Sequence, residues 1–220
     1  MRALIVGDKE KFNELILKLP EHVTACHYAV WEEFDPDTFD LIFDLNFDDS
    51  TTNIKFFGKL KIPAVVGAVK IRLSETVHEY REEVRCPLIG MNLLRGFINR
   101  EVSEITLAEK DREATDKLMQ QLKWKYSIVQ DRAGMVTPRI ICMIINEAYY
   151  TLQEGTASVN DIDIAMKLGT NYPYGPFEWA EKIGIKDVYE ILDAIYQDTR
   201  DERYKICPML KTKYLNGGTF

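Results

Sequence analysis

The sequence predicts an α/β fold in which a mainly parallel sheet is followed by an all-α C-terminal domain. Two observations lead to this prediction. In the first half, short apolar runs alternate with stretches in which apolar residues recur at helical spacing. In the second half, only the helical spacing recurs. The change falls between Gln130 and Gly134, which gives domains of residues 1–130 and 131–220.

The first domain opens with an apolar strand at residues 2–7 and an amphipathic helix at residues 9–19. Apolar, β-branched or aromatic runs predict further strands at residues 22–30, 39–47, 62–69, 86–92 and 126–131. Helical spacing predicts further helices at residues 51–61, 73–84 and 107–124. In the last of these helices, the residues expected to face inward are Leu118, Met119 and Leu122.

The second domain begins with a helix that starts near Pro138 and that Gly155 would end. The residues predicted on its inward side are Ile141, Ile144, Ile145, Ala148 and Leu152. A second helix has a start that resembles a capping box, with Ser158 followed by Asp161, and Gly169 is its stop signal.

The last long helical stretch, residues 175–197, begins with Pro176, which suits the first turn of a helix. Apolar residues at helical spacing follow it. The residues predicted to face inward are Trp179, Ile183, Val188, Ile191, Leu192 and Ile195.

The composition is typical of a soluble globular protein: the 220 residues are 46% hydrophobic and 29% charged, which is enough to bury a core. The net charge of −7 gives no electrostatic reason to attract nucleic acid or an anionic membrane. No apolar run approaches the roughly 18 to 20 residues that span a bilayer, and the start is not typical of a secretory signal. We therefore expect a cytoplasmic protein with no nucleic-acid and no membrane partner.

The four cysteines are widely separated in the sequence and form no CxxC pair. The sequence lacks the spacing of paired Cys and His residues that is typical of a zinc site, so neither a metal site nor a disulfide framework is indicated. We expect buried, reduced thiols at Cys26, Cys86, Cys142 and Cys207.

Five features of the second half resemble one family. They are Gly134, Arg139, the Asn146-Glu147-Ala148 triplet, the segment from Asp161 to Gly169, and the turn from Tyr172 to Glu178. Together they resemble the C-terminal domain of the 3-hydroxyacyl-CoA dehydrogenases. The likeness extends over about residues 60 to 218, and over the first 60 residues in outline.

The resemblance implies a Rossmann-like N-terminal domain that binds NAD, and a helical domain through which the protein forms a homodimer. It also implies an acyl-CoA substrate whose 3-hydroxyl is oxidised with a His base held by a Glu. The segment between residues 30 and 39 leaves no room for the helical excursion that the family has there. We therefore expect a reduced Rossmann-like domain.

The dinucleotide fingerprint needs several small residues at the turn after the first strand, where the backbone approaches the pyrophosphate. Only Gly7 remains, while Asp8 and Glu10 bring bulk and negative charge. The ribose-binding acid is expected about 20 residues on, near His27, which carries no carboxylate. Glu32 and Glu33 lie nearby, but a solvated charged turn is a better interpretation of them than a replacement for the ribose-binding acid. We therefore expect no bound cofactor.

The catalytic positions that the resemblance implies are also altered. Asn92 stands at the place of the His base, and an amide takes up no proton near neutral pH. Glu104 retains the orienting acid, whereas Ile71 and Pro138 replace the Ser and Asn that contact substrate. His78 is the candidate for a displaced base, but it lies on an amphipathic helix and is more typical of a surface residue.

These observations favour a non-catalytic, dimeric binding or partner subunit. The alternative is an active or residual NAD-dependent 3-hydroxyacyl-CoA dehydrogenase of fatty-acid or butanoate metabolism, with Glu104 or His78 as the base. A third hypothesis is that arginines bind acyl-CoA or another anionic small molecule, although solvated arginines are the simpler interpretation. The residues in question are Arg72, Arg95 and Arg100.

Overall fold

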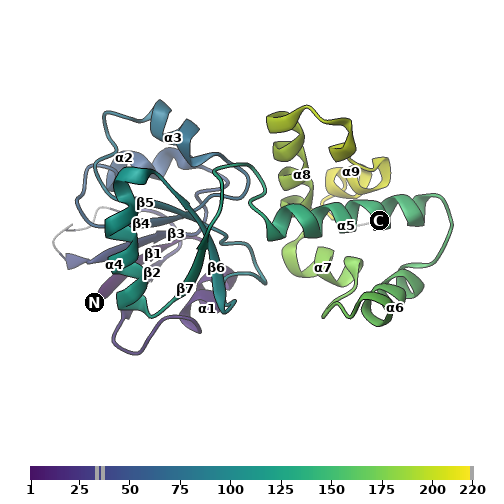
Figure 1. Ribbon diagram of the computed structural model, residues 1–220, viewed down its shortest axis with the longest axis horizontal. Helices are drawn as coiled ribbons and strands as arrows, with labels where there is room; N and C mark the ends of the chain where they lie inside the picture. The colour runs from purple at the N-terminus through teal and green to yellow at the C-terminus, as the bar shows by residue number, and fades with distance from the viewer. Residues whose placement is uncertain (33–34, 36–37, 219–220) are drawn as a thin grey trace. The chain divides into compact units, whose positions relative to one another are not determined.

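The structure is a computed structural model that describes residues 1–32, 35 and 38–218. The chain divides into two compact units, Met1–Met135 and Val136–Phe220 (Figure 1). We call them the sheet unit and the helical unit, and each is described by itself. Among the described residues, no helix is both long enough and apolar enough to cross a membrane.

The sheet unit contains a seven-stranded sheet in the order β2-β1-β3-β4-β5-β6-β7 among its described residues. All neighbouring strands are parallel except β5 and β6, which confirms the predicted mainly parallel sheet. The antiparallel β6 was not predicted. The strands are β1 (Arg2–Val6), β2 (Thr24–Tyr28), β3 (Leu41–Asp44), β4 (Ala64–Gly67), β5 (Leu88–Met91), β6 (Val102–Leu107) and β7 (Lys125–Ile128).

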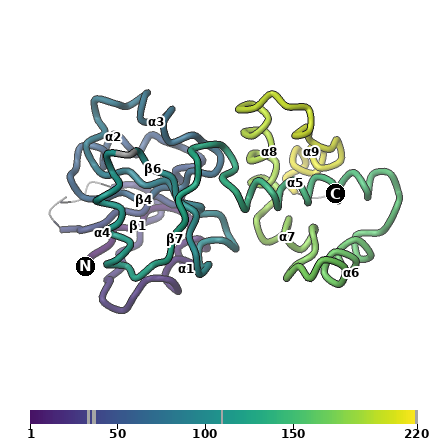
Figure 2. The backbone as a smooth tube through the Cα atoms, viewed as in Figure 1, coloured from purple at the N-terminus to yellow at the C-terminus, as the bar shows by residue number. Residues whose placement is uncertain are grey.

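Helices cover both faces of this sheet (Figures 1 and 2). They are α1 (Lys9–Ile16), α2 (Ile54–Phe57), α3 (Leu73–Glu79) and α4 (Arg112–Leu122), with 3-10 turns η2 (Thr51–Asn53) and η3 (Glu109–Asp111). Successive strand residues point to opposite faces, so the strands supply two apolar cores. One core packs against Leu15 of α1 and Leu118 of α4, and the other against Phe57 of α2 and Leu73 of α3. The predicted inward residues of α4 are buried.

The segment that follows β7 still belongs to the sheet unit. The Asp131 carboxylate accepts hydrogen bonds from the backbone N–H groups of Leu73 (2.8 Å) and Ser74 (2.7 Å), at the start of α3. The Gly134 N–H donates to the Val69 carbonyl at 2.6 Å. These contacts explain why the division falls after Met135, slightly beyond the point at which the sequence pattern changes.

The helical unit consists of helices joined by short turns. Pro176 occupies the first turn of its helix, and all six predicted inward residues of that stretch are buried, as expected. Ser158 accepts a hydrogen bond from the Asp161 N–H at 3.2 Å, which confirms the predicted cap. The helices are α5 (Thr137–Gln153), α6 (Val159–Thr170), α7 (Pro176–Ile183), α8 (Ile185–Thr199) and α9 (Pro208–Leu215), with the 3-10 turn η4 (Glu202–Tyr204).

The inward face of α5 differs from the predicted one. Ile145 and Ala148 are buried as expected, but Ile141, Ile144 and Leu152 are only half-buried. The polar Asn146, which was not predicted on this face, lies inward and binds the backbone around Cys207. The buried stripe is therefore made of Pro138, Cys142, Ile145, Asn146, Ala148 and Tyr149.

Two helix ends differ from the prediction: the end of α6 and the division between α7 and α8. Gly169 lies inside α6 instead of ending it, and Asn171 ends the helix in the left-handed region with φ of 55°. Asn tolerates this conformation because its short side chain is polar, so it serves as a cap much as glycine does. Gly184, with φ of 99°, separates α7 from α8 within the stretch read as one helical region.

The cysteines are all free among the described residues. Cys86, Cys142 and Cys207 are buried, as expected, and Cys26 is half-buried. Burial raises the pKa of the Cys86 thiol to about 12, so it stays protonated at neutral pH.

Candidate functional site

The carboxyl ends of β1, β3, β4 and β5 form the edge at which an open α/β sheet normally binds ligands. We call it the carboxyl edge. The chain passes from β1 to β2 on one side and returns to β3 on the other, so the order of strands reverses at β1. Gly7 stands at this point, directly after β1.

The turn after β1 is closed by side chains of the protein itself. Gly7 has a φ of 122°, and a Cβ there would lie 2.9 Å from Asn46 Oδ1. The same Asn46 oxygen accepts a hydrogen bond from the Asp8 N–H at 3.1 Å. The Asp8 carboxylate in turn caps α1 by accepting from the Lys11 N–H at 2.8 Å. The helix terminus that could hold a phosphate therefore holds an internal carboxylate.

Counted from Gly7, the second and third small residues of a G-x-G-x-x-G pattern fall on Lys9 and Phe12. The Phe12 ring stacks on His27 with 4.2 Å between the ring centroids, and the Lys9 ammonium lies 4.3 Å from the Phe12 centroid. His27 Nε2 is 2.9 Å from the Gly7 carbonyl oxygen. The residues present at this turn do not fit the dinucleotide fingerprint.

The last two residues of β2 are His27 and Tyr28, and neither carries a carboxylate. Glu32 is exposed, and Glu33 lies outside the described residues. Neither Glu32 nor Glu33 is therefore placed by the structure as a ribose-binding acid.

The structure brings Asn92 and Glu104 together across the antiparallel β5–β6 pair. The Asn92 N–H donates to the Glu104 carbonyl at 3.1 Å. The Asn92 side chain is 5% exposed, and its Oδ1 accepts from the Leu94 N–H at 3.3 Å. Asn92 thus stabilises the turn that leaves β5, and Glu104, half-buried, lies on the neighbouring strand.

The segment of residues 93–100, which follows Asn92, packs into the sheet unit. Its apolar residues with at most 3% exposure are Leu93, Leu94, Phe97 and Ile98. Glu14 of α1 accepts from the N–H groups of Gly96 (2.8 Å) and Asn99 (3.2 Å). Arg95 forms an ion pair with Glu10 of α1 at 2.6 Å. The segment is therefore attached to the same helix whose N-terminus adjoins Gly7.

Three charged residues are buried next to this edge, and the sequence analysis missed them. They are Lys11 of α1, Asp44 at the end of β3 and Asp48 just beyond it. Burial raises the pKa of the Asp44 carboxyl to about 6, against hydrogen bonds from Asn53 and Asn46 that lower it. Burial also raises the pKa of Asp48. The available signal was the spacing of two acids, four residues apart, directly after a buried strand.

The other predicted site residues are separated. Ile71 is half-buried and packs on the core beneath α2 and α3, while Pro138 belongs to the first turn of α5 in the helical unit. His78 is exposed on α3, as expected. The three arginines each contact a different residue: Arg72 pairs with Glu75, Arg95 with Glu10, and Arg100 lies over the Phe97 ring.

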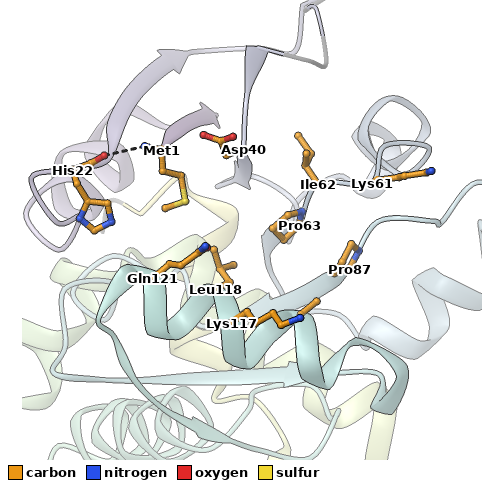
Figure 3. Close-up of a pocket in the computed structure, with 11 residues that line it drawn as sticks. Met1, His22, Asp40, Lys61, Ile62, Pro63, Pro87, Lys117, Leu118 and Gln121 are labelled. Atoms are coloured by element: carbon orange, nitrogen blue, oxygen red, sulfur yellow. Dashed lines mark hydrogen bonds between the residues drawn. The ribbon is translucent and has the colours of Figure 1, made fainter.

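A pocket of about 600 Å³ opens at the opposite, amino-terminal edge of the sheet (Figure 3). Pro63 and Pro87, which precede β4 and β5, line it together with Leu118 of α4. The Met1 nitrogen donates to the His22 carbonyl at 3.1 Å beside it. None of the predicted site residues lines this pocket.

The polar residues of the helical unit form internal contacts. The Asp163 carboxylate accepts from the N–H groups of Phe177 (2.8 Å) and Glu178 (3.3 Å), and so caps α7. A Cβ on Gly175 would lie 2.3 Å from Asp163 Cγ, so only glycine fits there. Asn146 donates to the Lys205 carbonyl at 3.0 Å and accepts from the Cys207 N–H at 2.8 Å.

Comparison with known sequences locates a relationship in the helical unit. Residues 134–219 match the family model described as 3-hydroxyacyl-CoA dehydrogenase, C-terminal domain. The 3-hydroxyadipyl-CoA dehydrogenase of Escherichia coli is 42% identical over 104 residues, 47% of this chain and 22% of the relative. The 3-hydroxybutyryl-CoA dehydrogenase of Bradyrhizobium diazoefficiens is 37% identical over 106 residues, 48% of this chain and 36% of the relative. The chain thus matches less than half the length of each relative.

Solved structures resemble the whole chain. The (S)-3-hydroxybutyryl-CoA dehydrogenase PaaH1 from Ralstonia eutropha superposes with a TM-score of 0.75 at 18% identity, covering 98% of this chain and 94% of that one. FadB2 from M. tuberculosis gives 0.77 at 14% identity, with the same two coverages. At these identities the likeness concerns the fold, and it confirms a Rossmann-like sheet followed by a helical domain.

Proposed function

Since this chain belongs to the 3-hydroxyacyl-CoA dehydrogenase family through residues 134–219, we propose that it is a non-catalytic member that acts as a dimeric binding or partner subunit. The proposal starts from a contrast between two sets of residues. One set carries the family resemblance, and the other set would have to carry the chemistry.

The observation that carries the proposal is that the resembling residues hold the helical unit together. Asp163 caps α7, Gly175 leaves room for that cap, and Asn146 binds the chain near Cys207. Arg139 donates to the Tyr204 hydroxyl at 2.9 Å. Residues with these internal functions are needed by a folded domain whether or not the protein is an enzyme.

The residues at the turn after β1 support the absence of NAD in the fingerprint pose. Asp8 occupies the terminus of α1 with its own carboxylate, so a pyrophosphate there would meet a negative charge. Phe12 and His27 stack where the fingerprint has a small residue. A hydride transfer without its nicotinamide has no acceptor, since the cofactor carries that chemistry.

Asn92 supports the absence of a general base at the family position. Its amide takes up no proton near neutral pH, and its oxygen is used by the Leu94 N–H. Glu104 lies opposite Asn92, as an orienting acid would. With no imidazole between them, the pair holds two strand ends together.

An apolar face on α6 supports the dimer part of the proposal. Leu168 is 82% exposed and Ile164 is 43% exposed, and their spacing of four places them on one side of the helix. Exposed apolar residues of this size mark interaction surfaces when they lie together. A second copy of the chain could cover this face by isologous contact.

The dimer part is tested by light scattering after gel filtration. The wild type is expected to run as a dimer at micromolar concentration, and Leu168→Glu as a folded monomer. Leu215→Glu, on the exposed face of α9, is the control, because Leu215 is 68% exposed on another helix. A monomeric wild type would contradict the dimer part of the proposal, but not the part that says the protein is non-catalytic.

The alternative function is an active or residual NAD-dependent 3-hydroxyacyl-CoA dehydrogenase. Glu104 favours it, because it is the one member of the expected catalytic set that this chain retains, and its backbone pairs with that of Asn92. Both functions allow the binding of an acyl-CoA. They differ in whether NADH binds and in whether a hydride is transferred.

The decisive experiment measures binding of NAD, NADH and acetoacetyl-CoA by calorimetry, and follows NADH absorbance in the same samples. We expect no nicotinamide binding and no turnover, with or without binding of the acyl-CoA. Asn92→His restores an imidazole beside Glu104 and is expected to stay inactive, because the fingerprint is still absent. Asn99→His, exposed on the same segment, is the matched control. Turnover by the wild type would establish the alternative.

A further inference from the structure

The buried charges beside the carboxyl edge form one connected group, which we call the Lys11–Asp44–Asp48 cluster. The exposed fractions are 5% for Lys11, 0% for Asp44 and 7% for Asp48. The Lys11 ammonium donates to the Leu45 carbonyl at 2.9 Å, so helix α1 is tied to the end of β3. Buried ionised groups are costly unless they are paired and hydrogen-bonded.

Asp44 holds the chain that follows β3. Its Oδ1 accepts from the Asn46 N–H at 3.1 Å, and its Oδ2 accepts from Asn53 Nδ2 at 2.8 Å. Asn53 belongs to η2, so one carboxylate joins the end of the strand to the first helical turn of the segment that follows. The charged residues that act on Asp44 are Lys11, which favours its ionised form, and Asp48, which opposes it.

Asp48 holds the chain that follows β4. Its Oδ1 accepts from the N–H groups of Val69 and Lys70, each at 2.7 Å. Its Oδ2 is buried and has no hydrogen-bond partner among the described residues. A Cβ on Gly67 would lie 2.7 Å from this oxygen, so the site is packed closely against β4. The oxygen has no solvent to replace the missing partner.

The charges in the cluster do not balance. Two buried carboxylates face one buried ammonium, Lys11, from α1. Lys70, from the loop after β4, also faces Asp48, but its ammonium forms an ion pair with Asp49 at 2.8 Å. With Asp49 included, three carboxylates therefore share two ammonium groups, so one negative charge of the group stays unbalanced.

We propose that the Lys11–Asp44–Asp48 cluster is a proton-linked switch, which takes up one proton in weakly acidic solution and then holds residues 44–53 more firmly to β4 and α1. Uptake removes the unbalanced charge without breaking the backbone hydrogen bonds that the carboxylates accept. The inference concerns the sheet unit alone and is independent of the proposed function.

The sign of the effect follows from the carboxyl of Asp44. Its pKa is raised to about 6 in the folded protein, against an ordinary value of 3.8. An acid with a raised pKa binds its proton more tightly when folded, so folding is favoured as the pH falls. Stability is therefore gained as the pH falls through about 6, is complete below 3.8, and is absent at neutral pH. The difference corresponds to on the order of a hundredfold in the unfolding equilibrium constant.

The first test is urea unfolding of the wild type, Asp44→Asn and Asp40→Asn at about pH 5 and about pH 7.5, either side of the Asp44 transition. Asp40 stands at the other end of β3 and is exposed, so it is the matched control. The wild type and Asp40→Asn are expected to lose on the order of tenfold in the folding equilibrium constant between the two pH values, beyond what Asp44→Asn loses, because pH 5 lies only partly through the Asp44 transition. An Asp44→Asn protein with the same pH dependence as the wild type would overturn the proposal.

The second test needs no variant. The carboxyl carbon of Asp44 is followed by NMR in the folded wild type as the pH changes. A midpoint near 6 is expected, and amide exchange of Val69 and Lys70, corrected for intrinsic rates, should slow below it. A midpoint near the ordinary value of 3.8 contradicts the proposal. Amide exchange of Val69 and Lys70 that does not change across the titration also contradicts it.

Discussion

The helical unit uses the hydrogen-bonding groups of its buried polar residues more completely than the sheet unit does. In the helical unit, both oxygens of Asp163 accept backbone N–H groups, and both ends of the Asn146 amide are bonded. In the sheet unit, one oxygen of Asp48 has no partner among the described residues. The family resemblance therefore rests on residues that fix an architecture. Evidence for or against chemistry has to come from the sheet unit.

The largest effect is expected from Gly175→Ala in the helical unit. The added Cβ would lie 2.3 Å from Asp163 Cγ, so Asp163 must move and release the N-terminus of α7. Overpacking and the lost cap together should lower the free energy of unfolding by roughly 3 kcal/mol. Urea unfolding measures the change.

Gly169→Ala is the control for that substitution. Gly169 lies inside α6 with open space around its Cα, so alanine should raise the free energy of unfolding by roughly 0.5–1 kcal/mol. Equal effects at the two glycines would mean that Gly175 has no special role in this unit.

A comparable effect in the sheet unit is expected from Leu94→Ala. Leu94 is fully buried in the segment after Asn92, and the cavity should cost about 3 kcal/mol. Its neighbour Arg95, half-buried, pairs with the exposed Glu10, and Arg95→Ala should cost less than about 1 kcal/mol. Thermal unfolding of both variants shows whether this segment is structural. A mild effect at Leu94 would indicate that it is free to open.

Asn146→Ala should have a smaller effect, of about 2 kcal/mol. It leaves the Cys207 N–H buried without its acceptor and frees the Lys205 carbonyl. Gln197→Ala, on the exposed side of α8, is the matched amide control and should be neutral. Guanidinium unfolding compares the two, and similar values would weaken the view that Asn146 organises this unit.

A smaller effect than that of Asn146→Ala is expected from Asp8→Ala, which removes the cap of α1 and should cost about 1 kcal/mol. It also clears one negative charge from the turn after β1. Since Lys9 and Phe12 remain at the fingerprint positions, calorimetry should still detect no NAD binding. Binding gained by this single change would show that Asp8 alone excludes the dinucleotide.

Much of the fold could be predicted because its signals are local. Ser158 and Pro176 mark helix starts by their own chemistry, and the inward residues of α7 and α8 follow from spacing alone. Gly169 misled the prediction, since the residue that turns left-handed is Asn171. The strand β6 was missed because a few residues of mixed polarity give no clear period.

The candidate site could be predicted only at single positions. Asn92 and Glu104 were identified from the family resemblance, and the backbone of Asn92, just after β5, does pair with that of Glu104 on β6. The Lys11–Asp44–Asp48 cluster was not identified, because charged residues are usually exposed and burial of a charge depends on distant segments. The cap that Asp163 makes on α7 was hidden for a similar reason, since it joins residues 14 positions apart.

The order of strands bears on how the protein is made. From β4 onward, each strand pairs with the strand that precedes it in the chain. A sheet with this order can grow strand by strand as the chain leaves the ribosome, without waiting for a later partner. Its contacts form early and between near neighbours, which shortens the loops that must close. All the strands of the sheet unit therefore find their partners among residues that precede Val136.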